Sequence, residues 1–249
     1  MIVFVTGASA GFGAAIARRF AKEGHRVVIT GRRRERLEAL VGELDRDKIL
    51  PLVFDVRDRA AVERAFEALP AAFAAIDVLV NNAGLALGLE PAQKANLDDW
   101  EAMVDTNVKG LMYVTRAALP GMVARDRGLI VNLGSTAARY PYPGGNVYGA
   151  TKAFVHQFSL NLRADLLGTR VRVTDIQPGL VGGSEFSTIR FHGDAERAAK
   201  LYEAADALTP EDVAEAIYWV ATLPPRVNIN AIEMMPVTQA FGPLAVHRG

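Results

Sequence analysis

Strand-length apolar runs alternate with longer helix-like segments along the whole chain, and this alternation restricts the fold more than any other feature. Several runs are rich in β-branched residues and apolar throughout, as expected for strands that helices cover on both faces. The candidate strands are Ile2–Thr6, Arg26–Thr30, Leu50–Phe54, Val78–Asn81, Leu129–Leu133, Val171–Ile176 and Asn230–Met234. These units predict one α/β domain with a doubly wound, seven-stranded and mostly parallel sheet and helices on both faces.

The segments between these strands carry helical patterns. We expect helices over Gly11–Glu23, Glu35–Leu44, Ala60–Phe73, Leu97–Arg125, Val147–Leu167 and Pro210–Thr222. Thr209 and Pro210 suit the N-cap and the first turn of the last of these helices. The stretch from Pro178 to about Arg197 lacks a helical pattern, and we interpret it as a lid or substrate loop, with a disordered insertion as the alternative.

Composition and charge exclude several classes of function. The 28 basic and 28 acidic side chains cancel, which gives no electrostatic basis for binding nucleic acid or an anionic membrane. The absence of cysteine excludes disulfides and thiolate metal sites and fits a reducing cytoplasm. Met1 leads directly into a strand-like segment, and no apolar run approaches the ~20 residues that cross a bilayer. We therefore expect a cytoplasmic protein with no membrane partner and, without clustered His and acidic ligands, no catalytic metal.

A glycine-rich turn joins the first strand to the first helix. Glycines tolerate positive φ and let the backbone approach a pyrophosphate, and the helix N-terminus offers unpaired N–H groups to the anion. The spacing is G-x-x-x-G-x-G, and a tight turn with no ligand is the alternative. Its position after a terminal strand favours a Rossmann-like dinucleotide site. The candidate residues are Gly7, Ser9, Ala10, Gly11, Phe12 and Gly13.

The end of the second strand indicates which dinucleotide binds. Proteins that bind NAD usually carry an acidic residue here for the ribose 2′-hydroxyl, whereas arginine accommodates a 2′-phosphate. This chain has Gly31 followed by Arg32 and Arg33, and an arginine fork pairs well with phosphate. The sequence therefore predicts NADP rather than NAD; the alternative is that RRRER only starts a solvated helix.

Tyr148 and Lys152 are one helical turn apart in VYGATKAF. Residues at this spacing share a helix face, with Cβ atoms roughly 5–6 Å apart. A neighbouring ammonium stabilises a phenolate and lowers the pKa of the phenol from its usual value of about 10. The pair is therefore a candidate acid/base device, although by itself it is also a common surface pairing.

Five motifs in order identify a family. TGASAGFG, NNAG at 81–84, Asn107 with Ser135, the Tyr148/Lys152 pair, and Pro178-Gly179 follow one another along the chain. Over essentially its whole length the chain resembles the short-chain dehydrogenase/reductases. It is most similar to their bacterial NADP-dependent 3-hydroxy acid dehydrogenases, also described as serine or allo-threonine dehydrogenases. The resemblance implies one domain over 1–249, with a cofactor half at about 1–130 and a catalytic and substrate half at about 131–249.

The resemblance implies four catalytic residues. Tyr148 is the general acid/base, and Lys152 lowers its pKa and holds the nicotinamide ribose hydroxyls. Ser135 hydrogen-bonds the reacting oxygen of the substrate. Asn107 disturbs the helix in which it lies and anchors a water that leads to Lys152.

The resemblance also implies cofactor contacts beyond the glycine turn. Asp55 would meet the adenine amine, and Asn82 would contact the cofactor ribose or instead lock the strand beside it. Where many family members have a Thr after Pro-Gly, this chain has Gly-Gly-Ser, so the backbone of Val181 is preferred to the hydroxyl of Ser184. The added cofactor candidates are Asp55, Val56, Asn82, Ala83, Gly84, Tyr148, Lys152, Pro178, Gly179 and Val181.

A small hydroxy acid needs a cation for its carboxylate. Arg190 is preferred over His192 and Arg139, the alternative being that all three are surface charges. The expected activity is NADP-dependent interconversion of short 3-hydroxy acids, such as 3-hydroxypropionate, serine and allo-threonine, with their semialdehydes or ketones. The alternatives are reduction of another short anionic aldehyde, such as sulfoacetaldehyde, and a non-catalytic NADP-sensing regulator.

The family resemblance also implies a homotetramer built on the helices at 97–125 and 147–167. His156 follows Lys152 by one turn and is expected at an interface between subunits. The C-terminal tail at 236–249 has few helix signals and is expected to pack across a partner subunit, and His247 within it is expected at the surface.

Overall fold

A computed structural model describes residues 1–242 of the protein; the end of the predicted tail, including His247, lies outside the described residues. Seven strands form one sheet in the order β3-β2-β1-β4-β5-β6-β7, and every neighbouring pair is parallel. The strands are β1 Ile2–Val5, β2 Arg26–Gly31, β3 Ile49–Val53, β4 Val78–Asn81, β5 Gly128–Leu133, β6 Val171–Pro178 and β7 Ala231–Met234. The predicted fold class is confirmed.

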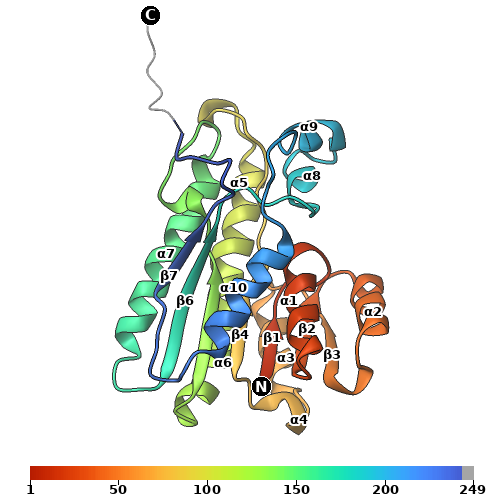
Figure 1. Ribbon diagram of the computed structural model, residues 1–249, viewed down its shortest axis with the longest axis vertical. Coiled ribbons are helices and arrows are strands. Elements are labelled where there is room, and N and C mark those ends of the chain that lie inside the picture. The colour runs from red at the N-terminus through yellow and green to blue at the C-terminus, as the bar shows by residue number, and fades with distance from the viewer. Residues whose placement is uncertain (243–249) are drawn as a thin grey trace, which may run out of the picture.

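Helices cover both faces of this sheet (Figure 1). Successive side chains of a strand point to opposite faces, so Val3 and Val5 pack into one core with α1 and α10, while Phe4 packs into the other with α3 and α6. Because both faces of the sheet are packed against helices, the strands appear in the sequence as continuous hydrophobic runs. The longer helices are α1 Gly11–Lys22, α2 Arg34–Glu43, α3 Arg59–Glu67, α5 Leu97–Val104, α6 Leu111–Ala124, α7 Asn146–Asp165 and α10 Pro210–Thr222.

Two predicted helices are interrupted. The segment expected as Leu97–Arg125 contains a π-helical turn, η3 at Asp105–Gly110, between α5 and α6. The segment expected as Ala60–Phe73 stops at Glu67, and the short helix α4 Ala71–Ala74 begins after Pro70, which cannot continue the preceding helix. The π turn contains Asn107, in agreement with the expectation that this residue disturbs its helix.

The stretch expected to be irregular carries two short helices, α8 Phe186–Arg190 and α9 Ala195–Lys200. Asp194 caps α9 by accepting a hydrogen bond from the backbone N–H of Arg197. Both helices lie above the carboxyl ends of the strands (Figure 1). The stretch is therefore an ordered cover over the sheet edge where open α/β folds bind ligands.

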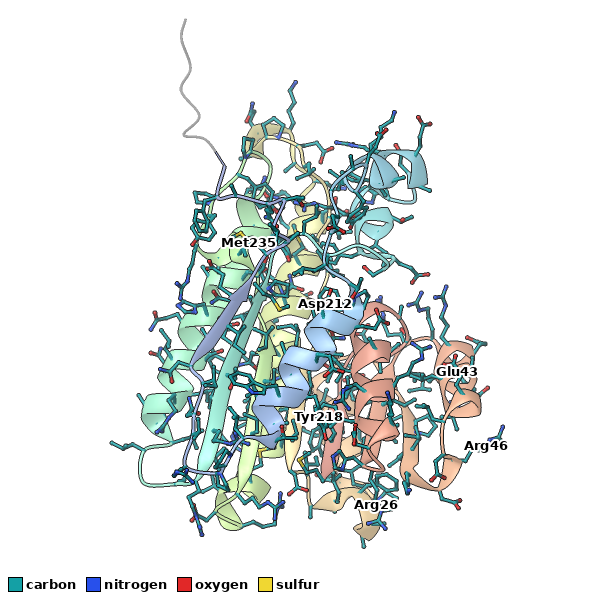
Figure 2. The ribbon with its side chains drawn as sticks, in the orientation of Figure 1. Arg26, Glu43, Arg46, Asp212, Tyr218 and Met235 are labelled. Carbon is teal, nitrogen blue, oxygen red and sulfur yellow. The ribbon has the colours of Figure 1, made fainter. Side chains whose placement is uncertain are left out.

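The same edge is closed on its other side by the chain after β7. Figure 2 shows Met235 at the upper end of β7, beside the segment that leads to Gly242. Gln239 from this segment accepts a 2.7 Å hydrogen bond from the backbone N–H of Leu180. Lower in the same view, Tyr218 of α10 lies beside α1 (Figure 2), and the Arg19 guanidinium of α1 is 3.7 Å from its ring centre. This packing holds α1, and with it the glycine turn, against the sheet.

Candidate active site

A cleft of about 650 Å³ opens at the carboxyl edge of the sheet. The glycine turn and the ends of β2 and β3 form one end of it, and the α7 pair Tyr148 and Lys152 forms the other. The chain from Pro178 to Arg190 and the segment from Met235 to Gly242 complete its walls. All of the predicted cofactor residues except Gly13 line this cleft.

Gly13 lies directly behind the phosphate turn. A Cβ atom at this position would lie 2.6 Å from the Asn82 amide nitrogen, so only glycine fits. Gly7 and Gly11 have positive φ values of 68° and 51°, which disfavour other residues. Within the described chain, no side chain caps the first turn of α1, so its N–H groups face the cleft as a pyrophosphate site requires. The turn therefore fits a dinucleotide.

Asn82 lines the cleft, and its side chain fixes the glycine turn in place. Its amide nitrogen donates to the carbonyl oxygens of Thr6, at 2.8 Å, and Gly7, at 3.1 Å. The Thr6 hydroxyl in turn accepts hydrogen bonds from the backbone N–H groups of Asn82 and Ala83. Of the two roles predicted for Asn82, these contacts support the structural one. The sequence did not lead us to predict this role for Thr6, although a hydroxyl residue at the end of the first strand is a signal for it.

Arg33 is the arginine most firmly held at the cleft. Its Nε and Nη2 atoms donate to the Ser9 hydroxyl at 3.3 and 3.1 Å, and Nη1 donates to the Glu185 carboxylate at 2.8 Å. Arg36 binds the other oxygen of Glu185 at 2.7 Å. The Glu185 carboxylate thus marks a position where two guanidinium groups converge on an anion. Neither Arg36 nor Glu185 was predicted from the sequence.

Arg32 is more loosely held, with a side chain 62% exposed and 3.8 Å from Asp55. The Asp55 carboxylate is bound more closely by Arg57, at 2.6 Å, and this hydrogen bond contributes to the lowered pKa of Asp55 against the raising effect of burial. Asp55 and the adjacent Val56 line the cleft beyond the arginines. This end of the cleft therefore presents both guanidinium groups and an ionised carboxylate.

Tyr148 is buried at the other end, with 8% of its surface exposed. Burial raises the pKa of Tyr148 to about 12, while a hydrogen bond with Ser135 and the charge of Arg190 act in the opposite direction. The sequence predicted a lowered pKa because Lys152 is near. In the described chain the loss of solvent outweighs the neighbouring charges, so the phenol is protonated at neutral pH.

Lys152 is buried behind Tyr148. Its Nζ atom donates a 2.7 Å hydrogen bond to the Leu133 carbonyl oxygen at the end of β5, and it lies 5.8 Å from the centre of the Tyr148 ring. Burial lowers the pKa of Lys152 to about 8, and the charge of Asp175 opposes this shift. A Cβ atom on Gly84 would lie 3.6 Å from Nζ, so this glycine leaves the ammonium room.

Asn107 in the π turn joins two parts of the site. Its side-chain oxygen accepts from the Leu85 N–H at 2.9 Å, and its nitrogen donates to the Leu85 carbonyl at 2.8 Å and to the Thr151 hydroxyl at 3.0 Å. Thr151 immediately precedes Lys152. Asn107 therefore fixes the segment after β4 against the helix that carries the Tyr148/Lys152 pair.

Of the three candidate cations, Arg190 alone lines the cleft. Its guanidinium lies 5.5 Å from the centre of the Tyr148 ring, donates to the Tyr142 hydroxyl at 2.7 Å and reaches the Gly88 carbonyl at 3.2 Å. His192, with a side chain 59% exposed, binds Asp99 instead, and Arg139 lies 4.0 Å from Glu233. The structure thus brings Arg190 to Tyr148 and directs the other two elsewhere.

The remaining predicted contacts lie along the chain after β6. Pro178, Gly179 and Val181 line the cleft, and Val181 pairs with Leu208 in an isolated β-bridge. Ser184 also lines it, with its side chain against Gly11 of the phosphate turn. Ser135 lies beside Tyr148 at the end of β5, where its hydroxyl accepts from the Ala137 N–H at 3.1 Å.

Comparison with protein families decides the classification of this fold and cleft. Residues 1–192 match the family described as short chain dehydrogenase. The chain belongs to the short chain dehydrogenase family. This confirms the family resemblance and makes the protein an oxidoreductase.

Other short chain dehydrogenases match over the full length. The NADP-dependent 3-hydroxy acid dehydrogenase YdfG of Salmonella typhi is 67% identical, covering 100% of both chains. Serine 3-dehydrogenase of Agrobacterium fabrum is 52% identical, covering 99% of this chain and 98% of its own. The closed form of a serine dehydrogenase complexed with NADP+ superposes with a TM-score of 0.99 at 64% identity, covering 100% of both chains. A serine dehydrogenase from Escherichia coli gives 0.86 at 60% identity, covering 96% of this chain and 100% of its own.

These short chain dehydrogenase relatives give no support to a sulfoacetaldehyde reductase or a non-catalytic regulator. Across residues 1–242, none of the helices has the length and apolar character needed to traverse a bilayer. In the same described part of the chain, His and acidic side chains do not gather into a group that could hold a metal ion.

Proposed function

We propose that this protein uses NADP to interconvert short 3-hydroxy acids with their semialdehydes or ketones. The observation that carries the proposal is the position of Arg190, whose guanidinium lies 5.5 Å from the Tyr148 ring centre in the same cleft. A 3-hydroxy acid carries its carboxylate two carbons from the reacting oxygen, so it needs a cation close to the acid/base. The names of the full-length relatives support the same substrate class and cofactor.

The glycine turn would hold the pyrophosphate of NADP, and Arg33 would bind the 2′-phosphate with Arg32 and Arg36 contributing charge. Asp55 and Val56 would bound the adenine. Lys152 would hold the nicotinamide ribose hydroxyls near Tyr148, with Gly84 leaving the space. The nicotinamide supplies or accepts the hydride when it is bound.

Tyr148 transfers the proton, and Ser135 stabilises the charge that develops on the reacting oxygen. In reduction, the protonated Tyr148 phenol donates to the carbonyl oxygen, and its pKa of about 12 keeps it protonated at neutral pH. In oxidation, the Tyr148 hydroxyl must first lose its proton, and the resulting phenolate then takes the proton of the alcohol. The Ser135 hydroxyl donates to the reacting oxygen and stabilises its charge in either direction. Asn107 contributes by fixing the backbone on both sides of this pair.

Steady-state oxidation rates with NADP+ test the substrate class. We expect turnover of 3-hydroxypropionate, L-serine and L-allo-threonine, and little turnover of isethionate or of ethanol, which lacks the acid group. The same panel with NAD+ should give much lower kcat/KM. Turnover of ethanol equal to that of 3-hydroxypropionate would contradict a carboxylate-specific site.

We also propose a cytoplasmic homotetramer. The exposed apolar side chains of Met112 on α6 and Leu160 on α7 support an interface on these two helices. Sedimentation equilibrium should give four times the 26.8 kDa chain mass. A monomer at micromolar concentration would contradict this assembly.

A further inference from the structure

A buried carboxylate, Asp175 on β6, lies beneath the catalytic helix and has no part in the roles proposed above. It is 1% exposed. Its Oδ2 atom accepts from the Gln177 amide at 2.5 Å and lies 2.9 Å from the His156 ring nitrogen Nδ1. Among the described residues, its Oδ1 atom has no hydrogen-bond partner. A buried carboxylate with one unpaired oxygen is costly and calls for a compensating charge nearby.

Several contacts place Asp175 near Lys152, although the two do not form an ion pair within 4.0 Å in the described chain. Asp175 pairs in register with Asn132, and the following residue of β5, Leu133, is the one whose carbonyl oxygen accepts from Lys152 Nζ. Gly134 has no room for a Cβ because the Oδ1 atom of Asp175 lies there. His156, which lies against Asp175 Oδ2, is one helical turn beyond Lys152. The unpaired oxygen therefore lies at Gly134, the residue after the one whose carbonyl oxygen accepts from the ammonium.

We propose that Asp175 is a positioning residue whose carboxylate is the buried counter-charge of the Lys152 ammonium. The inference rests on the proposed role of Lys152 in holding the cofactor. Lys152 is 7% exposed, and a buried ammonium with one carbonyl acceptor is unfavourable without an opposite charge. In agreement, the charge of Asp175 raises the pKa of Lys152 against the effect of burial.

The other groups around Lys152 do not supply this charge. Among the described residues, the titratable groups near Lys152 or Tyr148 are His156 and Tyr148 on α7, Tyr142 just before α7, Asp175 on β6 and Arg190 on α8, and of these only Asp175 carries a negative charge at neutral pH. The elements η3, η4 (Thr136–Ala138) and α5 pack against α7, and their buried side chains, such as Asn107, Thr136 and Met103, are neutral. His156, expected at a subunit interface, binds Asp175 within the chain and holds the carboxylate in place together with Gln177.

NADPH binding as a function of pH tests the proposal without relying on turnover. In the wild type, NADPH affinity should fall as the pH rises above about 8, because Lys152 loses its proton. Asp175→Asn removes the charge that favours this proton, so the fall should move about one pH unit lower. Lys152→Met should show no such fall in NADPH affinity, because it has no ammonium that could lose a proton. Ser159→Ala, which removes a buried neutral hydrogen bond on the same helix, is the control and should leave the fall at the wild-type pH.

The proposal would be overturned if NADPH affinity fell at the wild-type pH in Asp175→Asn, or if the pH of this fall moved equally in Ser159→Ala.

The stability of the double variant Lys152→Met/Asp175→Asn gives a second test that uses neither NADPH nor turnover. Lys152→Met removes the proposed counter-charge of the buried Asp175 carboxylate, so adding Asp175→Asn should restore part of the lost stability to urea. Additive losses in the double variant would also overturn the charge pair. If Tyr148→Phe keeps turnover, the proposed acid/base fails while both of these tests still report on Asp175.

Discussion

The Lys152 ammonium lies 5.8 Å from the centre of the Tyr148 ring, and both side chains are buried at the end of the cleft. Burial moves their pKa values in opposite directions, to about 12 for Tyr148 and about 8 for Lys152. Each group is therefore pushed toward its neutral form. A protonated phenol is a proton donor at neutral pH, whereas the lysine depends on its surroundings to remain charged.

The stability of the protein should record the lowered pKa of Lys152. In the unfolded chain the lysine keeps its proton up to 10.5, whereas in the folded chain it loses it near 8. Between these values the unfolded state binds more protons, so the contribution of Lys152 to the free energy of unfolding rises with pH. We expect a rise on the order of 3 kcal/mol relative to Lys152→Met, measured by urea unfolding from pH 8 to 10.5. A constant difference between the two proteins across this range would contradict the buried ammonium.

Replacing Arg33 should weaken NADP+ binding far more than NAD+ binding. Charge-assisted hydrogen bonds to phosphate are worth about 1.5–3 kcal/mol, so Arg33→Ala should raise the dissociation constant of NADP+ about tenfold or more. Arg32→Ala should have a smaller effect because that side chain is 62% exposed, and the double variant a larger one. Arg34→Ala, which removes an exposed arginine paired with Glu38, serves as the control. Equal weakening of NADP+ and NAD+ in Arg33→Ala would argue against a phosphate contact.

Two Gly→Ala substitutions should have opposite effects on stability. At Gly13 the new methyl group would lie 2.6 Å from the Asn82 amide nitrogen, so Gly13→Ala should cost at least about 1–3 kcal/mol and abolish cofactor binding. At Gly42, in α2, it meets nothing within 4 Å, so Gly42→Ala should stabilise by about 0.5–1 kcal/mol. Thermal unfolding with and without NADPH checks both. Normal NADPH binding by Gly13→Ala would show that the turn has room for a side chain at this position.

Arg190 should set the affinity for the acid group. With 3-hydroxypropionate as substrate, Arg190→Met should raise the Michaelis constant about tenfold or more with little change in NADP+ binding, because the lost contact is charge-assisted. Arg190→Lys should restore only part of the affinity for 3-hydroxypropionate, since the ammonium cannot reproduce the guanidinium fork that contacts both Tyr142 and Gly88. His192→Gln is the control, since His192 binds Asp99 at the surface. An unchanged Michaelis constant in Arg190→Met would remove Arg190 from the substrate site.

The seven strands and the candidate site residues could be predicted from the sequence because they follow from local patterns, whereas the order of the strands in the sheet was not predicted. Continuous apolar runs predicted the strands of the sheet. The strand ends that carry Gly7, Arg33 and Ser135 meet at one edge in any parallel α/β fold. The spacing of Tyr148 and Lys152 placed both on one helix face. Even the disturbance at Asn107 was foreseen, although its π-helical form was not.

The features that were missed depend on contacts between distant segments. Glu185 reaches Arg33 across 152 positions of the sequence, and nothing near either residue signals the pairing. The contact between His156 and Asp175 on the neighbouring strand was not predicted, while the expected position of His156 at a subunit interface stays a prediction. The pKa of Tyr148 is raised, whereas the sequence predicted that it would be lowered, because the sequence shows the nearby lysine but not the degree of burial.

Turnover by Tyr148→Phe is the most direct test of the account, because this change removes one hydroxyl from a ring that stays packed against Phe186. We predict that the variant binds NADPH with wild-type affinity and oxidises 3-hydroxypropionate at least about a hundredfold more slowly, since it lacks the proton acceptor. Near-wild-type turnover with intact NADPH binding would contradict the assignment of Tyr148 as the acid/base.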